Sequence, residues 1–160
     1  MKEIAKYLRE TMDFVLPKLN NITNAEASIK PQPEKWSPKE IIGHLIDSAC
    51  NNQQKFVRTM QQPHLQFVGY QQDSWVALQQ YNKADWSHLV KTWVAYNHQI
   101  AHIIENVDPS VLSHTISIES SEPFTLKFIM TDYNEHLKHH LKQILPEAGL
   151  TRGFENVYNA

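Results

Sequence analysis

The sequence predicts an all-α protein, a four-helix bundle with a long connection between its second and third helices. Apolar residues recur at three- and four-residue steps in four separate stretches of the 160-residue chain. Glycine is scarce, at four residues, and no stretch shows the regular turn signals of a β-sandwich. Apolar residues make up 41% of the chain and charged residues 20%, which is typical of a globular protein. Four amphipathic helices of this kind bury their apolar faces against one another in a bundle.

The first expected helix spans residues 2–19. Its apolar face consists of Ile4, Leu8, Met12, Val15 and Leu19. Pro17 and the pair Asn20 and Asn21 are expected to mark its end.

The second expected helix has a strong start signal. Ser37 is suited to the N-cap, Pro38 to the first helical position, and Glu40 to the third, where it closes a capping box. Trp36, just before the cap, is well placed to pack as a hydrophobic staple. The helical pattern then continues to the Gln-Gln-Pro sequence at 61–63, which ends it.

The second half of the chain contains the long connection and two more helices. From residue 63 to residue 83 the helical pattern weakens, which predicts a long ordered loop with a short helix near 74–80. Loops over a rigid bundle usually carry specificity, so this loop is the expected source of substrate contacts. Helical spacing returns over 84–106 and ends at Asp108-Pro109.

Residues 114–118 alternate polar with β-branched residues and are expected to form a short extended piece or a hairpin arm. Thr125 can cap the last helix, which is predicted to run to about Leu145 and to stop at Pro146. We expect a single domain over residues 1–150 followed by a C-terminal tail at 151–160.

Composition and charge exclude several classes of protein. The net charge is −2 with no basic stripe, which argues against nucleic-acid binding. Cys50 is the only cysteine, so no intramolecular disulfide is possible and a reducing compartment is expected. No apolar run approaches the roughly 20 residues of a membrane span, and the N-terminus lacks the apolar core of a signal peptide. We therefore expect a cytoplasmic protein with no membrane partner.

Nine histidines are many for this length, and helical phase helps to sort them. His136 and His140 stand four apart, so they share one face of the last helix, at the border of its apolar arc. His139 falls close to the opposite side. His98 and His102 have the same spacing but lie about 180° from the apolar side of their helix, so we expect them at the surface.

A pair of histidines binds metal tightly only with a third ligand, because two-ligand sites are rarely tight. His44, one turn into the second helix, is the best candidate from the residues alone. Its phase lies off the apolar arc, beside Ser48 and Asn51, which fits either solvent or a polar cleft. The isolated His64 and His88, and likewise His114, are better explained by surface or capping roles.

Two runs of the sequence resemble the paired signature of the DinB superfamily, a group of DinB/YfiT-like metal-dependent enzymes. The runs are WSPKEIIGHLID at 36–47 and HLKHHLKQI at 136–144. In that family a Trp-Ser/Thr-x-x-Glu-x-x-x-His start to the second helix supplies one metal ligand. A His-x-x-His-His-x-x-Gln-Ile run on the fourth helix supplies two more, and the two runs lie near opposite ends of the bundle sequence.

The resemblance implies that His44, His136 and His140 bind a divalent metal ion and that His139 does not. The usual Arg-Gly between the double histidine and glutamine is Leu141-Lys142 here, which leaves the ligands untouched but the subfamily open. Three histidines suit zinc, nickel, iron or copper. The resemblance also implies a small-molecule substrate and a homodimer.

Three neutral imidazoles leave open coordination positions, as in catalytic rather than structural metal sites. The first functional hypothesis is transfer of a low-molecular-weight thiol to an electrophilic substrate, since members of the resembled family include such transferases. The second is metal-dependent hydrolysis, and the third is a non-catalytic bundle that binds a metal or a small molecule.

Hydrolysis would need a carboxylate base near the metal, and none stands out in the sequence. Asp47 and Glu135 are close in sequence to ligands, but neighbours on a helix point about 100° apart. Asp132 shares a face with His136 and could orient its imidazole, or it could be a surface charge. Cys50 lies among core residues, where a lone cysteine is usually inert.

Overall fold

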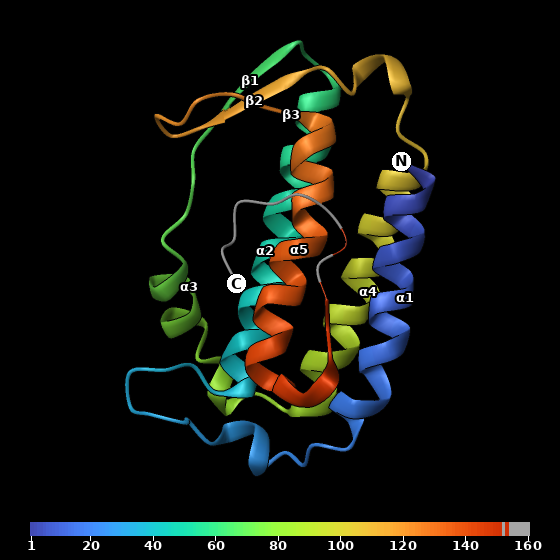
Figure 1. The fold of residues 1–160 in the computed structure, drawn as a ribbon. Coiled ribbons are helices and arrows are strands. Elements are labelled where there is room, and N and C mark those ends of the chain that lie inside the picture. Colours follow the sequence, from blue (N-terminus) through green and yellow to red (C-terminus); the bar gives the residue numbers. More distant parts are fainter. Residues whose placement is uncertain (152, 154–160) are drawn as a thin grey trace.

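A computed structural model describes residues 1–151 and 153 of the chain and confirms the four-helix bundle (Figure 1). Four long helices form it: α1 (Lys2–Asn20), α2 (Pro38–Met60), α4 (Trp86–Glu105) and α5 (Leu126–Ile144). Short 3-10 turns at Glu26–Ser28, Tyr81–Lys83, Pro109–Val111 and Pro146–Ala148 join or end them. The tail expected at 151–160 lies outside the described residues except for Thr151 and Gly153.

The long connection between α2 and α4 sets the topology. It contains β1 (His64–Phe67) and α3 (Gln72–Gln79), so the short helix predicted near 74–80 is confirmed. Figure 1 shows the connection running back along the length of the bundle before α4 begins. Because of this return, α2 and α4 point the same way, whereas α5 runs antiparallel to α2.

A three-stranded sheet lies at the end of the bundle where α2 ends and α5 begins (Figure 1). In it β1 pairs in parallel with β2 (Thr115–Ile118), and β2 pairs antiparallel with β3 (Phe124–Thr125). The extended piece expected at 114–118 is therefore confirmed. The strand in the long connection was not expected, because β1 is four residues long and its partner lies 51 residues further along the chain.

The end of helix α1 lies within one residue of its predicted position. Pro17 lies inside the helix, in its last turn, and the helix ends at Asn20. Proline removes the hydrogen bond to the carbonyl four residues earlier, that of Asp13. Asp13 is exposed, so water can satisfy that carbonyl, and this explains why the helix is not broken there.

The start of α2 forms the capping box that the sequence predicts. Ser37 Oγ accepts a hydrogen bond from the Glu40 amide, and Glu40 Oε2 accepts one from the Ser37 amide at 2.8 Å. Lys30 Nζ pairs with Glu40 Oε1 at 2.9 Å. This box fixes the first turn of α2, and His44 follows one turn later.

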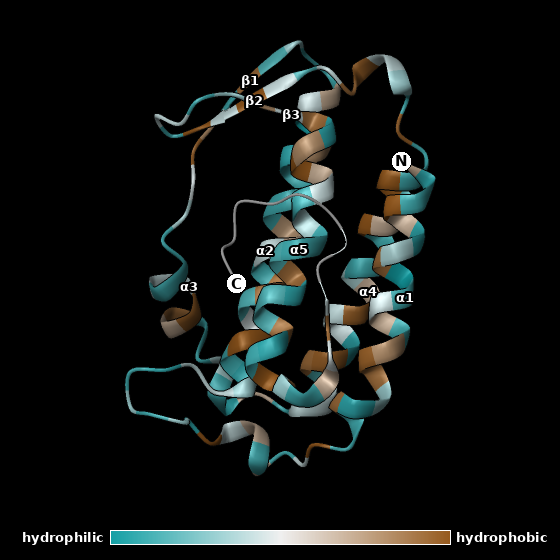
Figure 2. Ribbon diagram, viewed as in Figure 1, coloured by the Kyte–Doolittle hydropathy of each residue, from teal (hydrophilic) through white to brown (hydrophobic). Residues whose placement is uncertain are grey.

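The core lies between the four bundle helices, where α1 packs on α4 and α2 packs on both α4 and α5. Figure 2 shows that each bundle helix carries both hydrophobic and hydrophilic residues. Fully buried side chains include Leu8, Met12, Ile42, Phe56, Trp93 and Met130. Each contributes about 1.5–3 kcal/mol by leaving water. None of the described helices has the length and apolar character that crossing a bilayer requires.

Candidate metal centre

The fold brings His44 together with His136 and His140, which lie more than 90 residues further along the chain. His44 extends from the second turn of α2, and His136 and His140 from the C-terminal half of α5. Each offers one ring nitrogen, and these nitrogens lie within 4.8 Å of one another. The Nε2 atoms of His44 and His136 are 3.3 Å apart. Two nitrogens bound to zinc at tetrahedral geometry would be separated by about 3.3 Å, so this pair is already at ligand spacing.

Burial keeps the three imidazoles neutral near neutral pH. It lowers the pKa of His44 to about 3, with the neighbouring His140 adding to the effect. It lowers the pKa of His140 to about 4, partly opposed by the hydrogen bond to Gln143. The pKa of His136 is likewise held well below its usual value by burial and by the other two histidines. Neutral imidazole is the form that binds metal.

Two of the three rings are oriented by a partner at the nitrogen that faces away from the group. Ser48 Oγ lies 3.2 Å from His136 Nδ1, and Gln143 Oε1 lies 3.4 Å from His140 Nδ1. Such contacts fix the tautomer and leave Nε2 free to bind a metal. His44 Nδ1 is buried and has no hydrogen-bond partner among the described residues. The donor set fits a divalent d-block ion.

Trp36 forms an aromatic wall beside the histidines. Its ring centre lies 5.0 Å from that of His44 and 6.2 Å from that of His140. From the sequence, Trp36 was expected only to pack before the α2 cap. Its place beside the metal centre depends on the approach of α5, which no local pattern reveals.

The remaining histidines fall largely where helical phase predicts. His98 and His102 are exposed, so their surface assignment is confirmed. His139 is partly buried and packs edge-on against His140, with ring centres 5.1 Å apart, but it is not in the three-histidine group. His88 is exposed on the first turn of α4.

Two isolated histidines bind neighbouring segments instead of a metal. His64 Nδ1 lies 2.8 Å from Thr115 Oγ1, across the pairing of β1 with β2. His114 Nδ1 lies 2.8 Å from the Thr59 carbonyl near the end of α2. The exposed His64 agrees with the surface role expected for it, and the contact of His114 with a carbonyl in the last turn of α2 agrees with a capping role.

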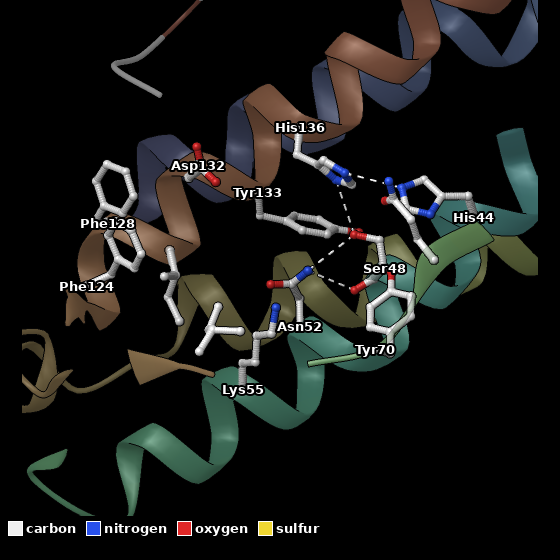
Figure 3. Close-up of a pocket in the computed structure, with 13 residues that line it drawn as sticks. His44, Ser48, Asn52, Lys55, Tyr70, Phe124, Phe128, Asp132, Tyr133 and His136 are labelled. Atoms are coloured by element: carbon white, nitrogen blue, oxygen red, sulfur yellow. Dashed lines mark hydrogen bonds between the residues drawn. The ribbon is translucent and has the colours of Figure 1, made fainter. Parts of the chain in front are cut away.

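A cleft of about 250 Å³ leads from His44 and His136 along the groove between α2 and α5 (Figure 3). We call it the inner cleft. Its other lining residues are Ser48, Asn52, Lys55, Tyr70, Gln72, Ile118, Phe124, Phe128, Ile129, Asp132 and Tyr133. Tyr70 and Gln72 come from the long connection, which was expected to supply substrate contacts. The inner cleft is polar near the histidines and apolar near the sheet.

One face of α2 supplies the polar wall of the inner cleft. Ser48 and Asn52 follow His44 at four-residue steps, and Lys55 comes three residues later. Asn52 Nδ2 donates to the Ser48 carbonyl at 2.9 Å and to Ser48 Oγ at 3.3 Å. Residues four apart share a helix face, so this spacing in the sequence could have placed Ser48 and Asn52 in the site.

A second, wider hollow of about 500 Å³ reaches the metal centre at His140. We call it the outer hollow. Trp36 and Gln143 line it beside His140, and the remaining lining residues are Pro31, Gln32, Glu34, Lys35, Ile41 and Asp73. The three histidines therefore line two hollows. His44 and His136 line the inner cleft, and His140 lines the outer hollow.

Two carboxylates close in sequence to ligands are engaged elsewhere. Asp47 accepts hydrogen bonds from the Tyr81 hydroxyl at 2.7 Å and from Gln79 Nε2 at 2.9 Å. Glu135 forms a buried ion pair with Lys138 at 2.6 Å. Both side chains are at most 4% exposed.

Two other acidic or nucleophilic candidates occupy different surroundings. Asp132 lines the inner cleft together with His136, so it is more than a surface charge. Cys50 is partly buried and does not line either hollow.

Comparison with known proteins places the chain among bundles of the same kind. The family model of the DinB superfamily matches residues 7–144. No curated protein matches the chain. YfiT from Bacillus subtilis, described as a probable metal-dependent hydrolase with an unusual four-helix bundle topology, has a similar structure. Its TM-score is 0.81 at 16% identity, over 90% of this chain and 83% of that one. A DinB-like protein, YjoA from Bacillus subtilis, gives a TM-score of 0.59 at 18% identity, over 94% of both chains. At these identities the likeness shows the fold.

Proposed function

The chain belongs to the DinB superfamily, and we propose that it is a metal-dependent enzyme that transfers a low-molecular-weight thiol to an electrophilic small molecule. In this proposal His44, His136 and His140 hold a divalent ion, zinc, nickel or iron. Such an ion, when bound, lowers the pKa of a thiol or a water and supplies a nucleophile near neutral pH. The observation that carries the proposal is the convergence of three neutral imidazoles between two hollows, one lined by His44 and His136 and the other by His140.

The two hollows favour a reaction with two organic substrates. Transfer requires a thiol and an electrophile to reach the same centre, whereas hydrolysis requires one substrate and water. The inner cleft reaches His44 and His136, and the outer hollow reaches His140. Substrates bound in both would approach the three histidines together, which is the proximity that a two-substrate reaction needs.

The positions of the carboxylates also favour a thiol over water. A free thiol has a pKa of about 8.5 and water one of about 15.7, so a thiol needs far less help to lose its proton. Asp47 and Glu135 are committed to Tyr81 and Lys138, which leaves neither free to act as a base. The site is thus better suited to a nucleophile that ionises readily.

Tyr70 is suited to bind the electrophile in the inner cleft. Burial raises the pKa of its hydroxyl, and the charges of Asp47 and Cys50 add to this. The hydroxyl therefore stays protonated and can donate a hydrogen bond to an oxygen of the substrate. Its ring is held against Trp75, with centres 4.7 Å apart.

Hydrolysis is the second candidate, and one residue favours it. Asp132 lines the inner cleft on the same helix face as His136 and could accept a proton from water. The description of YfiT as a probable metal-dependent hydrolase points the same way. Loss of esterase activity in Asp132→Asn, with thiol transfer unchanged, would support this second reaction.

The experiment starts from protein purified without an affinity tag, whose metal is identified by elemental analysis. The metal-loaded protein is then mixed with cysteine and monobromobimane, and bimane fluorescence reports the rate of thiol alkylation. We expect a rate well above that of the variant with His44, His136 and His140 all changed to Ala. A His98→Ala/His102→Ala variant, with the same spacing on the exposed face of α4, is expected to keep the full rate.

Three outcomes would contradict the proposal. A metal-free protein that resists reconstitution removes both enzyme hypotheses together. A rate equal to that of the triple-alanine variant, tested also with glutathione, removes thiol transfer. Retained metal with no turnover of thiols, esters or phosphates would favour a non-catalytic binding bundle.

A further inference from the structure

The inner cleft contains a cation that the metal centre does not use. Resting on the function proposed above, we propose that Lys55 binds a carboxylate of the substrate in the inner cleft. The cleft would then select small molecules that carry a carboxylate beside an apolar group, with the reacting atom directed toward His44 and His136. Lys55 is a specificity-determining residue in this proposal.

The position of Lys55 along α2 carries the first part of the argument. It lies eleven residues after His44, which is about 16 Å along a helix at 1.5 Å per residue. Both residues line the same cleft, with Ser48 and Asn52 between them. Figure 3 shows the Lys55 side chain rising from α2 beside Asn52, away from the histidines. A substrate that contacts both ends must therefore be elongated.

Within the part of the chain that the structure describes, the Lys55 ammonium group has unused hydrogen-bond donors. Among the described residues, no hydrogen bond or ion pair from Lys55 Nζ is found. Asp132 acts on Lys55 electrostatically, and the centre of the Phe67 ring lies 5.6 Å from Nζ. A largely buried ammonium with unused donors is costly in a folded protein. An anionic group bound in the cleft would satisfy those donors.

Aromatic and aliphatic side chains supply the apolar part of the site. Phe124 and Phe128 are stacked, with ring centres 5.2 Å apart and planes 15° from parallel. Ile118 and Ile129 line the cleft with them, near the sheet. Figure 3 shows Phe124 and Phe128 at the end of the cleft far from His44. This end favours an aromatic or branched apolar group.

The charges around Lys55 favour a carboxylate over a phosphate ester. Among the described lining residues Lys55 supplies the one ammonium group, and Asp132 lies on the opposite wall (Figure 3). A dianionic phosphate carries two negative charges, one more than the ammonium group of Lys55 balances. A monoanionic carboxylate matches the single charge of Lys55, and its oxygens accept charge-assisted hydrogen bonds from the ammonium group.

The test compares 4-phenylbutyrate with its neutral isostere 4-phenylbutanamide by isothermal titration calorimetry at pH 7.5. The full chain is used after metal removal, because a metal ion would bind a carboxylate by itself. We expect the acid to bind about tenfold or more tightly than the amide, as a charge-assisted hydrogen bond of ordinary strength gives. In Lys55→Met this preference should vanish while the affinity for the amide stays the same.

Two further variants act as controls. Lys55→Arg keeps the cation and should keep a preference for the acid, and it guards against misfolding of Lys55→Met. Lys91→Met removes an exposed lysine of α4 and should change nothing. Equal affinities for acid and amide, a preference that survives in Lys55→Met, or binding of neither compound would each overturn the proposal. Failure of thiol transfer would leave this comparison unaffected, so the two proposals can fail separately.

Discussion

At the scale of single residues, the metal centre combines three titratable rings in an environment that rejects their charge. His44 is 1% exposed and His140 is 9% exposed. Once one ring is charged, its repulsion also opposes charging of a second ring a few ångströms away. The same features that prepare neutral ligands therefore make the metal-free protein sensitive to acid.

The free energy of unfolding of the metal-free protein should fall with pH in a window set by these rings. The pKa of His44 is about 3 and that of His140 about 4 in the folded protein, against about 6.5 when unfolded. The unfolded chain thus binds more protons in this range, and each histidine removes up to about 1.4 kcal/mol per pH unit. This stability is fully present above pH 6.5 and is lost progressively toward pH 4 for His140 and pH 3 for His44.

Urea unfolding at pH 4.5 to 7.5 measures this dependence. A variant with His44, His136 and His140 changed to Gln should show a much smaller slope. Changing the exposed His98 and His102 to Gln should leave the slope as it is in the unmodified protein. Equal slopes in the unmodified protein and the triple variant would show that the three rings are not held neutral.

Ser48 is the residue whose removal should test ligand orientation most cleanly. Its hydroxyl lies 3.2 Å from His136 Nδ1 and is not itself a ligand. Loss of such an orienting partner typically weakens metal affinity by 10- to 100-fold. We expect a decrease of this size for zinc in Ser48→Ala, measured by competition with a chelating dye. Ser87→Ala, at an exposed position of α4, serves as the control, and an unchanged affinity in Ser48→Ala would refute the role.

The ligands could be predicted from the sequence to an unequal degree. The spacing and phase of His136 and His140 place them together on one face of a helix. His44 could be assigned only through the resemblance, because its phase fits solvent as well as a cleft. Trp36 and Lys55 were not connected with the site, since their contacts form only when α2 and α5 pack together. Metal binding by the three histidines stays a prediction.

At the scale of elements, the packing of the end of the long connection against α2 depends on a glycine. An added Cβ at Gly43 would lie 2.1 Å from the Tyr81 ring, which rests directly on α2. Tyr81 in turn donates a hydrogen bond to Asp47, one turn further along the helix. The contact of Tyr81 with α2 therefore anchors the end of the long connection beside Gly43, the residue before His44.

Gly43→Ala should therefore destabilise the protein, although alanine is the better helix former by about 1 kcal/mol. The methyl group would displace the ring of Tyr81 and its bond to Asp47, a form of overpacking that costs about 1–3 kcal/mol. Thermal or urea unfolding measures the effect. The matched control is the same change in a Tyr81→Ala background, where the space is empty and Gly43→Ala should be neutral or stabilising. The same loss of stability in both backgrounds would exclude the steric explanation.

Local and distant interactions explain which elements were predictable. The caps of α2 and α5 were predicted because Ser37 with Glu40, and Thr125 with Phe128, lie three residues apart in the chain. Strand β1 was missed because its hydrogen bonds are made to a segment 51 residues away. Pro17 is tolerated in the last turn of α1 because Asp13, whose carbonyl it leaves unpaired, is exposed.

At the scale of the whole molecule, the crossover connection makes the site possible. Because α2 and α5 run antiparallel, the beginning of α2 lies beside the end of α5 (Figure 1). The four-helix class could be predicted from periodicity, whereas the direction of α4 could not, since local periodicity does not reveal the path of a 25-residue connection. The homodimer stays a prediction, which sedimentation velocity can check.

A metal ion bound by α2 and α5 should stabilise the entire bundle. His44 and His136 are 92 residues apart in sequence, so a shared ion would join two elements that separate on unfolding. An ion at 100 times its Kd adds about 2.7 kcal/mol to the free energy of unfolding. For a chain of this length we expect zinc to raise Tm by about 5–10 °C over the EDTA-treated protein. Scanning calorimetry measures the shift.

The triple-alanine variant at His44, His136 and His140 should show no shift in Tm with zinc, and His98→Ala/His102→Ala should show the full shift. A zinc-induced rise that persists in the triple variant would place the metal elsewhere on the molecule.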